Sequence, residues 1–273
     1  MIIDTHSHLN FNAFKEDLDE VAKRTVAQNI WTINVGTKYE TSQSAIEVAQ
    51  KYGEGFFATI GLHPIYAAAE FVKTKTDPDE GEFLIKEHTF EKEKYKDLAN
   101  SKKVVAIGEI GLDYYYKPKT TAKLAQFKEK QKQVFLEQLD LARELKLPVI
   151  LHCRMAHDDV IEILESRGEN KGVIHCFTGT LEQAKKYIEM GFYLGINGII
   201  FKFNIDEIIK NYLLDKLLIE TDCPYLTPLP EAPKRNEPIF IKHTIQKIAD
   251  LKGVSFQEVV NKTTQNAKKL FNI

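Results

Sequence analysis

The feature that most constrains the fold of this chain is a regular alternation of short apolar runs with longer amphipathic stretches. Each apolar run is rich in β-branched residues and has the length of a buried strand. The eight runs are Ile2–His6, Trp31–Val35, Phe56–Gly61, Val104–Glu109, Pro148–Cys153, Gly172–Phe177, Phe192–Asn197 and Lys216–Thr221. Eight repeats of a strand followed by a helix predict an α/β fold of the TIM (β/α)₈ barrel type.

The chain continues beyond the eighth predicted strand. A proline-rich segment at 224–238 is followed by two more helical patterns. With 273 residues, 43% of them hydrophobic, the chain can bury one large core, and barrels of this length commonly form one domain. We therefore expect a single domain over residues 1–273, a barrel with C-terminal helices.

One connection is longer than the others, since about forty residues separate Pro64 from the fourth strand. Between Lys73 and Lys96 it is crowded with acidic residues and lysines. We expect a charged insertion at about residues 66–100, after the third strand. It is either a solvated loop that leads into a helix or a lid over the face of the barrel that carries active sites.

Ionisable residues gather at the carboxyl ends of the predicted strands, where barrels carry their active sites. His6 and His8 lie two positions apart, so their side chains point the same way and can bind one ion together. A single histidine at such a place is more often structural than a metal ligand. The whole set at one end of the barrel changes this interpretation: His6, His8, Glu109, His152, His175 and Asp222. Burying these groups together is costly without a cation, and they suffice for two divalent ions that share a bridging carboxylate.

Motifs in a fixed order over nearly the whole chain carry a family resemblance. They are Asp4–His8, Gly61–Pro64, Val104–Asp113, Leu151–Arg154, His175–Gly179, Glu220–Leu226, Arg235–Pro238, and Asn266–Ala267 before Leu270–Phe271. In these motifs the sequence resembles the TatD-type metal-dependent deoxyribonucleases of the amidohydrolase superfamily. The fourth strand offers Glu109 and no inward lysine, which favours this branch over the cyclic-amide hydrolases, whose metals are usually bridged by a modified lysine.

The resemblance implies a role for each candidate residue. His6 and His8 would hold one metal, and His152 and His175 the second. Glu109 would bridge the two metals and count among the catalytic residues. Asp222 would bind metal and orient or deprotonate the attacking water. His63 and Arg154 would be catalytic residues on the substrate side.

The implied activity is hydrolysis of phosphodiester bonds in DNA, as a 3'-5' exodeoxyribonuclease on single strands. Its nucleophile would be a hydroxide on two divalent ions, because a metal-bound water titrates near neutrality. The ligand types leave Mg, Mn, Zn, Co and Fe open. Two alternatives remain. One is a D-aminoacyl-tRNA deacylase; the other is a non-catalytic metal-binding barrel protein, against which the complete ligand set argues.

Two features near the fourth and fifth strands can each be interpreted in two ways. Tyr114, Tyr115 and Tyr116 either stack unpaired bases or pack a loop against the barrel mouth. Arg154 either contacts a substrate phosphate or forms a salt bridge at the rim.

Composition limits the remaining classes of function. The chain has 37 basic and 39 acidic residues and a formal charge of -2, so a DNA substrate must be held locally rather than by a global positive field. It shows neither a signal peptide pattern nor a membrane-spanning run. The three cysteines form no C-x-x-C pair, which fits a reducing compartment. We expect a soluble, cytoplasmic protein with no membrane partner, and infer no obligate protein partner.

Overall fold

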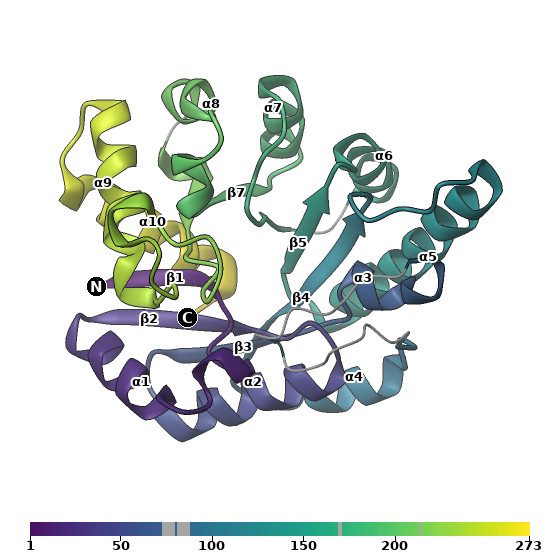
Figure 1. Ribbon diagram of the computed structural model, residues 1–273, viewed down its shortest axis with the longest axis horizontal. Coiled ribbons are helices and arrows are strands. Elements are labelled where there is room, and N and C mark those ends of the chain that lie inside the picture. Colours follow the sequence, from purple (N-terminus) through teal and green to yellow (C-terminus); the bar gives the residue numbers. More distant parts are fainter. Residues whose placement is uncertain (73–79, 81–87, 169–170, 213) are drawn as a thin grey trace.

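The computed structural model describes residues 1–72, 80, 88–168, 171–212 and 214–273. Its eight parallel strands pair in chain order and form a nearly closed barrel with helices around it, as predicted (Figure 1). The strands are β1 (Ile2–Ser7), β2 (Ile30–Val35), β3 (Phe56–Ile60), β4 (Val104–Asp113), β5 (Val149–Arg154), β6 (Gly172–Ile174), β7 (Tyr193–Ile196) and β8 (Leu217–Ile219).

Closure between β1 and β8 occurs beside the predicted metal ligands. The backbone N–H of Asp222 donates to the carbonyl of His6, and the N–H of His8 donates to the carbonyl of Cys223, both at 2.8 Å. A parallel bridge pairs Ser7 with Cys223. The backbone bonds that join the first strand to the last therefore also fix the spacing of His6, His8 and Asp222.

Helices follow the strands and cover the outside of the barrel (Figure 1). Outside the connection between β3 and β4, the α-helices of the described residues are α1 (Leu18–Ala27), α2 (Tyr39–Tyr52), α5 (Thr121–Leu145), α6 (His157–Arg167), α7 (Leu181–Glu189), α8 (Asp206–Asn211), α9 (Ile241–Lys252) and α10 (Phe256–Phe271). Short 3₁₀ turns are η1 (Asn12–Phe14), η3 (Gly198–Phe201), η4 (Leu214–Lys216), η5 (Leu229–Glu231) and η6 (Pro238–Phe240). The C-terminal helix α10 packs beside the start of the chain, since Thr264 of α10 donates to the carbonyl of Met1 at 3.2 Å.

Local sequence signals explain where several helices begin and end. The hydroxyl of Ser255 accepts from the N–H of Glu258 at 3.1 Å and caps the start of α10. Gly253, at φ 66°, ends α9 in a left-handed conformation that glycine adopts without strain. The apolar faces of these helices then pack against the outer face of the strands.

An apolar layer lies beneath the candidate site. Ile150 and Val173 are fully buried and belong to one cluster with residues from β1, β2, β4 and β8. They precede His152 and His175 by two positions, so each apolar side chain and its histidine share one face. The barrel thus supplies a rigid apolar floor below the polar groups.

Most strand ends fall within one residue of the prediction, but β6 and β8 end clearly earlier than the sequence predicts and β4 ends clearly later. β6 ends at Ile174 rather than Phe177, and β8 ends at Ile219 rather than Thr221. The reason is that Cys176 and Asp222 have φ angles of 46° and 57°, which an extended strand does not allow. β4 instead continues past Glu109 to Asp113.

The expected insertion is described at its two ends. It begins with α3 (Pro64–Ala67) and η2 (Ala69–Phe71) and ends with α4 (Lys92–Leu98), the helix to which the loop was expected to lead. Residues 73–79 and 81–87 lie outside the described residues, as does most of the charged run, and the lid stays a prediction.

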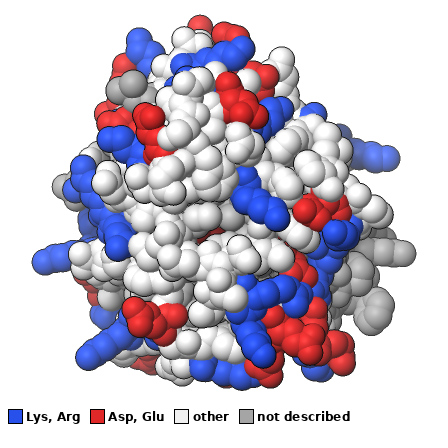
Figure 2. Space-filling view, turned by 90° about the vertical axis from the view of Figure 1, so that its left-hand side faces the viewer, with Lys and Arg blue, Asp and Glu red and all other residues white. Residues whose placement is uncertain are grey.

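Within the described part of the chain, no helix combines the length and the apolar character needed to cross a membrane. Basic and acidic side chains are interspersed around the face drawn in Figure 2, and its centre consists mostly of uncharged residues. On this face, mixed charge agrees with the formal charge of -2.

Candidate metal centre

All six predicted metal ligands and His63 come together at the carboxyl ends of the strands. Glu109 of β4 lies at the centre of this cluster. Its Oε1 lies 2.7 Å from Nδ1 of His152 and 3.6 Å from Nε2 of both His63 and His175. Its Oε2 lies 3.5 Å from Nε2 of His6. One carboxylate therefore faces imidazoles from β1, β5, the end of β3 and the end of β6.

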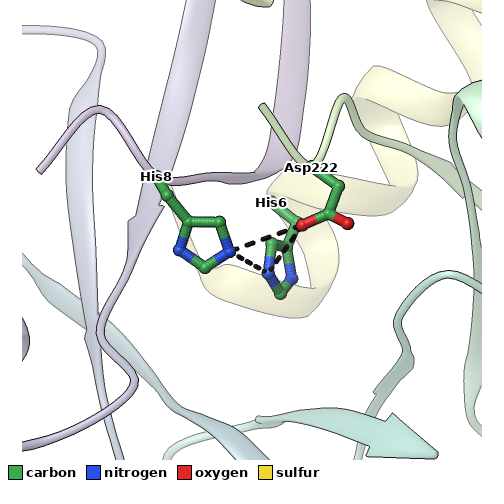
Figure 3. A group of neighbouring side chains, drawn as sticks. All are labelled: His6, His8 and Asp222. Atoms are coloured by element: carbon green, nitrogen blue, oxygen red, sulfur yellow. Dashed lines mark hydrogen bonds and ion pairs between the residues drawn. The ribbon is translucent and has the colours of Figure 1, made fainter. Parts of the chain in front are cut away.

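The second carboxylate, Asp222, lies beside His6 of β1 and His8, which follows β1 (Figure 3). Its Oδ1 is 3.4 Å from Nε2 of His8 and 3.7 Å from Nε2 of His6. The two Nε2 atoms are 3.1 Å apart. At 14% exposure, the Asp222 side chain is the more open of the two cluster carboxylates. These three donors converge on one point and satisfy the spacing needed to hold one ion.

The hydrogen bonds around the histidines show that the donor set fits a cation. Nδ1 of His8 lies 3.0 Å from the carbonyl of Val35, which can only accept, so in the neutral ring Nδ1 carries the proton. The Nε2 lone pair then points toward Asp222, another acceptor. The lone pairs of His8 Nε2 and Asp222 Oδ1 repel each other unless a positive ion lies between them. This arrangement therefore matches a metal site.

His152 and His175 have a similar arrangement around Glu109. Burial favours a neutral imidazole, but the neighbouring carboxylates raise the pKa of His152 to about 9 and that of His175 to about 10. Burial would also raise the pKa of Glu109, yet the surrounding imidazoles hold it well below its usual value. The cluster therefore favours an anionic Glu109 with positive charge next to it.

His63 differs from the other imidazoles, because one of its ring nitrogens is already used. Nδ1 accepts from the backbone N–H of Ile65 at 3.1 Å and caps α3. Nδ1 therefore holds no proton, and in the neutral ring the proton is on Nε2, which faces Glu109. Burial, followed by the neighbouring His152, lowers the pKa of His63 to about 3. His63 thus presents a neutral N–H donor to the site.

Two carboxylates that the sequence analysis did not select lie behind the histidines. Oδ2 of Asp113 is 3.1 Å from Nε2 of His152. Oε1 of the fully buried Glu220 is 2.9 Å from Nδ1 of His175. The only signals in the sequence were their positions: Asp113 ends the fourth strand motif, and Glu220 precedes Asp222 by two residues.

Arg154 lies apart from this cluster. Its exposed guanidinium stacks on Tyr115, with Cζ 3.6 Å from the ring centroid. None of the ion pairs among the described residues involves Arg154, so no such salt bridge at the rim is observed there. The structure therefore groups six predicted ligands with His63 and places Arg154 beside exposed aromatic rings.

A barrel with imidazoles and carboxylates at the carboxyl ends of its strands has the architecture of a metal-dependent hydrolase. Comparison with known proteins supports that class. The chain belongs to the TatD family, because the family model described as TatD related DNase matches residues 3–272.

Relatives over the full length agree. The chain is 39% identical over 279 residues to a Bacillus subtilis protein called uncharacterized metal-dependent hydrolase YabD, covering all of both chains. It is 34% identical to the 3'-5' ssDNA/RNA exonuclease TatD of Citrobacter rodentium, covering all of this chain and 98% of the relative. The crystal structure of YJJV, a TatD homologue from Escherichia coli, superposes with a TM-score of 0.82 at 28% identity, covering 100% and 98% of the two chains. The chain is therefore a metal-dependent hydrolase.

Proposed function

We propose that this hydrolase cleaves phosphodiester bonds of single-stranded DNA, removing nucleotides from the 3' end. The observation that carries the proposal is the position of Glu109, whose two oxygens face imidazoles from both halves of the cluster. Such a carboxylate can bridge two divalent ions, the arrangement that stabilises both the attacking and the leaving oxygen of phosphoryl transfer. The name of the Citrobacter rodentium relative supports the substrate class.

In this proposal, each ion has its own set of ligands. His6, His8 and Asp222 hold the first, and His152 and His175 hold the second, with Glu109 between them. When bound, the ions supply Lewis acidity toward the phosphate and lower the pKa of water. Mg, Mn, Zn, Co and Fe remain candidates, since mixed nitrogen and oxygen ligands accept several of them.

Asp222 and His63 have complementary proton roles in this proposal. Burial would raise the pKa of Asp222, but neighbouring imidazoles, His175 foremost, lower it, so Oδ1 is available to accept a proton from the attacking water. As that water attacks phosphorus, the ester oxygen leaves and needs a proton or a hydrogen-bond donor. The neutral Nε2–H of His63 donates a hydrogen bond to that oxygen. The proton that completes the leaving hydroxyl is the one that Asp222 accepted from the water.

The form of the substrate follows from burial and charge. His6, His8, His175 and Glu109 are each at most 5% exposed, so a scissile phosphate must enter the mouth of the barrel. An unpaired strand end bends more easily than a duplex and can follow it there. With a formal charge of -2, the protein has no net positive charge with which to attract a duplex over a long range.

The test uses the full-length protein with and without metal. Chelation should abolish cleavage of a linear single strand, and added divalent ion should restore it. A strand labelled at its 5' end should give a ladder that shortens from the 3' end, while a circular single strand should stay intact. Cleavage that survives exhaustive chelation, or cleavage of the circle, contradicts the proposal. Hydrolysis of D-aminoacyl-tRNA without cleavage of DNA would replace it with the deacylase.

A further inference from the structure

The three consecutive tyrosines after β4 have two different environments. Tyr114 is buried, its hydroxyl donates to Asp159 of α6 at 2.7 Å, and Lys128 of α5 lies over its ring. Tyr115 and Tyr116 instead leave 49% and 43% of their surface exposed. The packing interpretation is therefore right for Tyr114, but it does not account for the two rings that follow.

The exposed rings form an ordered group with Arg154. Its guanidinium lies 3.6 Å from the centroid of Tyr115 and 5.9 Å from that of Tyr116. The two tyrosine rings meet edge to face, 4.8 Å apart at 87°. We call Tyr115, Tyr116 and Arg154 the aromatic platform. It combines flat apolar surface with a cation that pairs with no carboxylate among the described residues.

Backbone contacts attach the aromatic platform to the metal centre. Asp113 and Arg154 are register partners on β4 and β5, and the N–H of Tyr114 donates to the carbonyl of Arg154 at 2.9 Å. Oδ1 of Asp113 accepts from the N–H of Tyr115 at 2.8 Å, while Oδ2 contacts His152. A single buried carboxylate therefore connects a candidate ligand to the first ring of the platform.

The chemistry of the platform matches an unpaired nucleotide. An exposed aromatic ring offers a stacking surface to any base, but the bases of a duplex already stack on one another and are not available. A guanidinium that stacks on an aromatic ring can still use the N–H groups at its edge. These groups bind a phosphate in a bidentate manner. The platform thus offers aromatic rings to the base of a nucleotide and a guanidinium to its phosphate.

We propose that the aromatic platform is a nucleotide subsite beside the metal centre. The unpaired base next to the scissile phosphate stacks on Tyr115, with the perpendicular ring of Tyr116 at its edge, and Arg154 binds the adjoining phosphate. This inference rests on the proposed function, since it assumes a single-stranded nucleic acid as substrate. It adds that the bases of the strand, and not its backbone alone, contribute to binding and cleavage.

The test compares three single strands. One has normal bases throughout, and each of the other two has an abasic residue at one of the last two positions of the 3' end. Cleavage is measured as kcat/KM with metal, and binding as fluorescence anisotropy in chelator. The proteins are wild type, Tyr115→Ala, Tyr115→Phe, Arg154→Gln and the control Phe203→Ala. Phe203, 58% exposed, lies after β7, three strands along from β4.

Wild type should prefer the normal strand over at least one abasic strand by about tenfold in binding and in kcat/KM, the size expected of one stacked base. Tyr115→Ala should lose this preference, whereas Tyr115→Phe and Phe203→Ala should keep it. Arg154→Gln should weaken binding of all strands alike, because it removes a phosphate contact.

The outcomes separate the two proposals. If wild type cleaves every strand at the same rate, the DNA hydrolysis stands and the subsite is wrong. If wild type binds with the base preference but cleaves nothing, the subsite stands and the proposed reaction is wrong. Absence of both binding and cleavage overturns both. A base preference that Tyr115→Ala retains also overturns the subsite, and circular dichroism confirms that each variant is folded.

Discussion

Oδ2 of Asp113 lies 3.1 Å from Nε2 of His152, on the far side of the imidazole from Glu109, whose Oε1 lies 2.7 Å from Nδ1. The ring is thus held at both nitrogens. Gln131 of α5 fixes Asp113 in turn, since its side-chain amide exchanges two hydrogen bonds with the Asp113 backbone, at 2.9 and 3.0 Å. A carboxylate behind a metal-binding imidazole sets its tautomer and raises its basicity.

Asp113→Asn should therefore weaken metal binding without unfolding the barrel. The amide keeps the shape but loses the negative charge, so Nδ1 of His152 becomes a poorer donor. We expect a loss of about tenfold to a hundredfold in affinity for one of the two ions. Calorimetric titration of metal into chelated protein measures it. Asp159→Asn is the matched control, because Asp159 bonds Tyr114 and Lys132 but no histidine. Equal affinities in wild type and both variants would falsify the role of Asp113.

Glu220 is the corresponding residue behind His175, and it is also a structural group. Its Oε1 accepts from the backbone N–H of Cys176 at 2.8 Å and from Nδ2 of Asn197 at 3.0 Å. Gly195 of β7 makes room for it, since a Cβ there would lie 2.6 Å from Oε2. This buried carboxylate therefore joins β7 and β8 to the turn that carries His175.

Glu220→Ala should destabilise the metal-free protein by about 2–5 kcal/mol, because two buried donors and an imidazole lose their partner. Glu220→Gln should cost less, since its amide oxygen can still accept both bonds. The measurement is urea unfolding in chelator. Glu182→Ala, an exposed position in the first turn of α7, should change the free energy of unfolding by less than about 1 kcal/mol. Indistinguishable midpoints for Glu220→Ala and Glu182→Ala would contradict this assignment.

Periodicity alone was enough to predict the barrel, because eight apolar runs of strand length can bury their sides in few other ways. It also predicted that the six candidate ligands lie close together, since parallel strands end on one face of the barrel. Their roles as ligands stay predictions. His6 and His8 illustrate why the geometry was predictable: His6 lies on β1 and His8 directly after its end, and the alternation of side chains still brings both to Asp222.

Alternation failed where the backbone leaves the extended region. Cys176 follows a candidate ligand by one position, so regular alternation predicts that it faces the helices, as Cys153 does beside Tyr187. Its φ of 46° turns it toward Asn197 instead, with Sγ 3.6 Å from Oδ1. Asp113 and Glu220 were missed for another reason. A sequence motif shows that a carboxylate is near a strand end, but which imidazole nitrogen it contacts depends on the register between strands.

Substitutions at Glu109 and Asp222 test the proposed ligand set. Glu109→Ala removes the one carboxylate among the described residues that faces both halves of the cluster, so metal content and turnover should both fall to background. Asp222→Asn keeps the shape but accepts a proton poorly, and we expect turnover to fall by at least about a hundredfold. Elemental analysis and cleavage of a short single strand measure the two effects. Asp215→Asn, an exposed carboxylate on η4, is the control. Full metal content and near-normal turnover in both variants would place the site elsewhere.

The last prediction concerns His157, a buried histidine outside the metal cluster. Its Nδ1 lies 3.1 Å from the Tyr187 hydroxyl and 3.2 Å from Sγ of Cys153. Nε2 is buried without a hydrogen-bond partner among the described residues. Burial lowers the pKa of His157 to about 4, because the charged imidazolium would lack water there; nearby Asp158 opposes the shift and His152 adds to it.

The sign of the effect on stability follows from this shift. Between pH 6.5 and 4 the unfolded chain binds a proton at His157 and the folded protein does not, so acid favours unfolding. The contribution of His157 to stability is complete above pH 6.5, falls as the pH drops below it and levels off near pH 4. Going from pH 7 to 5 should cost about 2 kcal/mol through this residue alone.

His157→Phe isolates this contribution, because phenylalanine keeps the ring beside Phe177 and Tyr187 but cannot titrate. Other buried histidines also titrate, so the informative quantity is the difference between the two proteins. The loss in the free energy of unfolding from pH 7 to 5 should be about 2 kcal/mol smaller in the variant than in wild type. Urea unfolding in chelator at several pH values gives both curves. Parallel curves would mean that His157 is protonated in the folded protein, or that its environment opens in acid before the barrel unfolds.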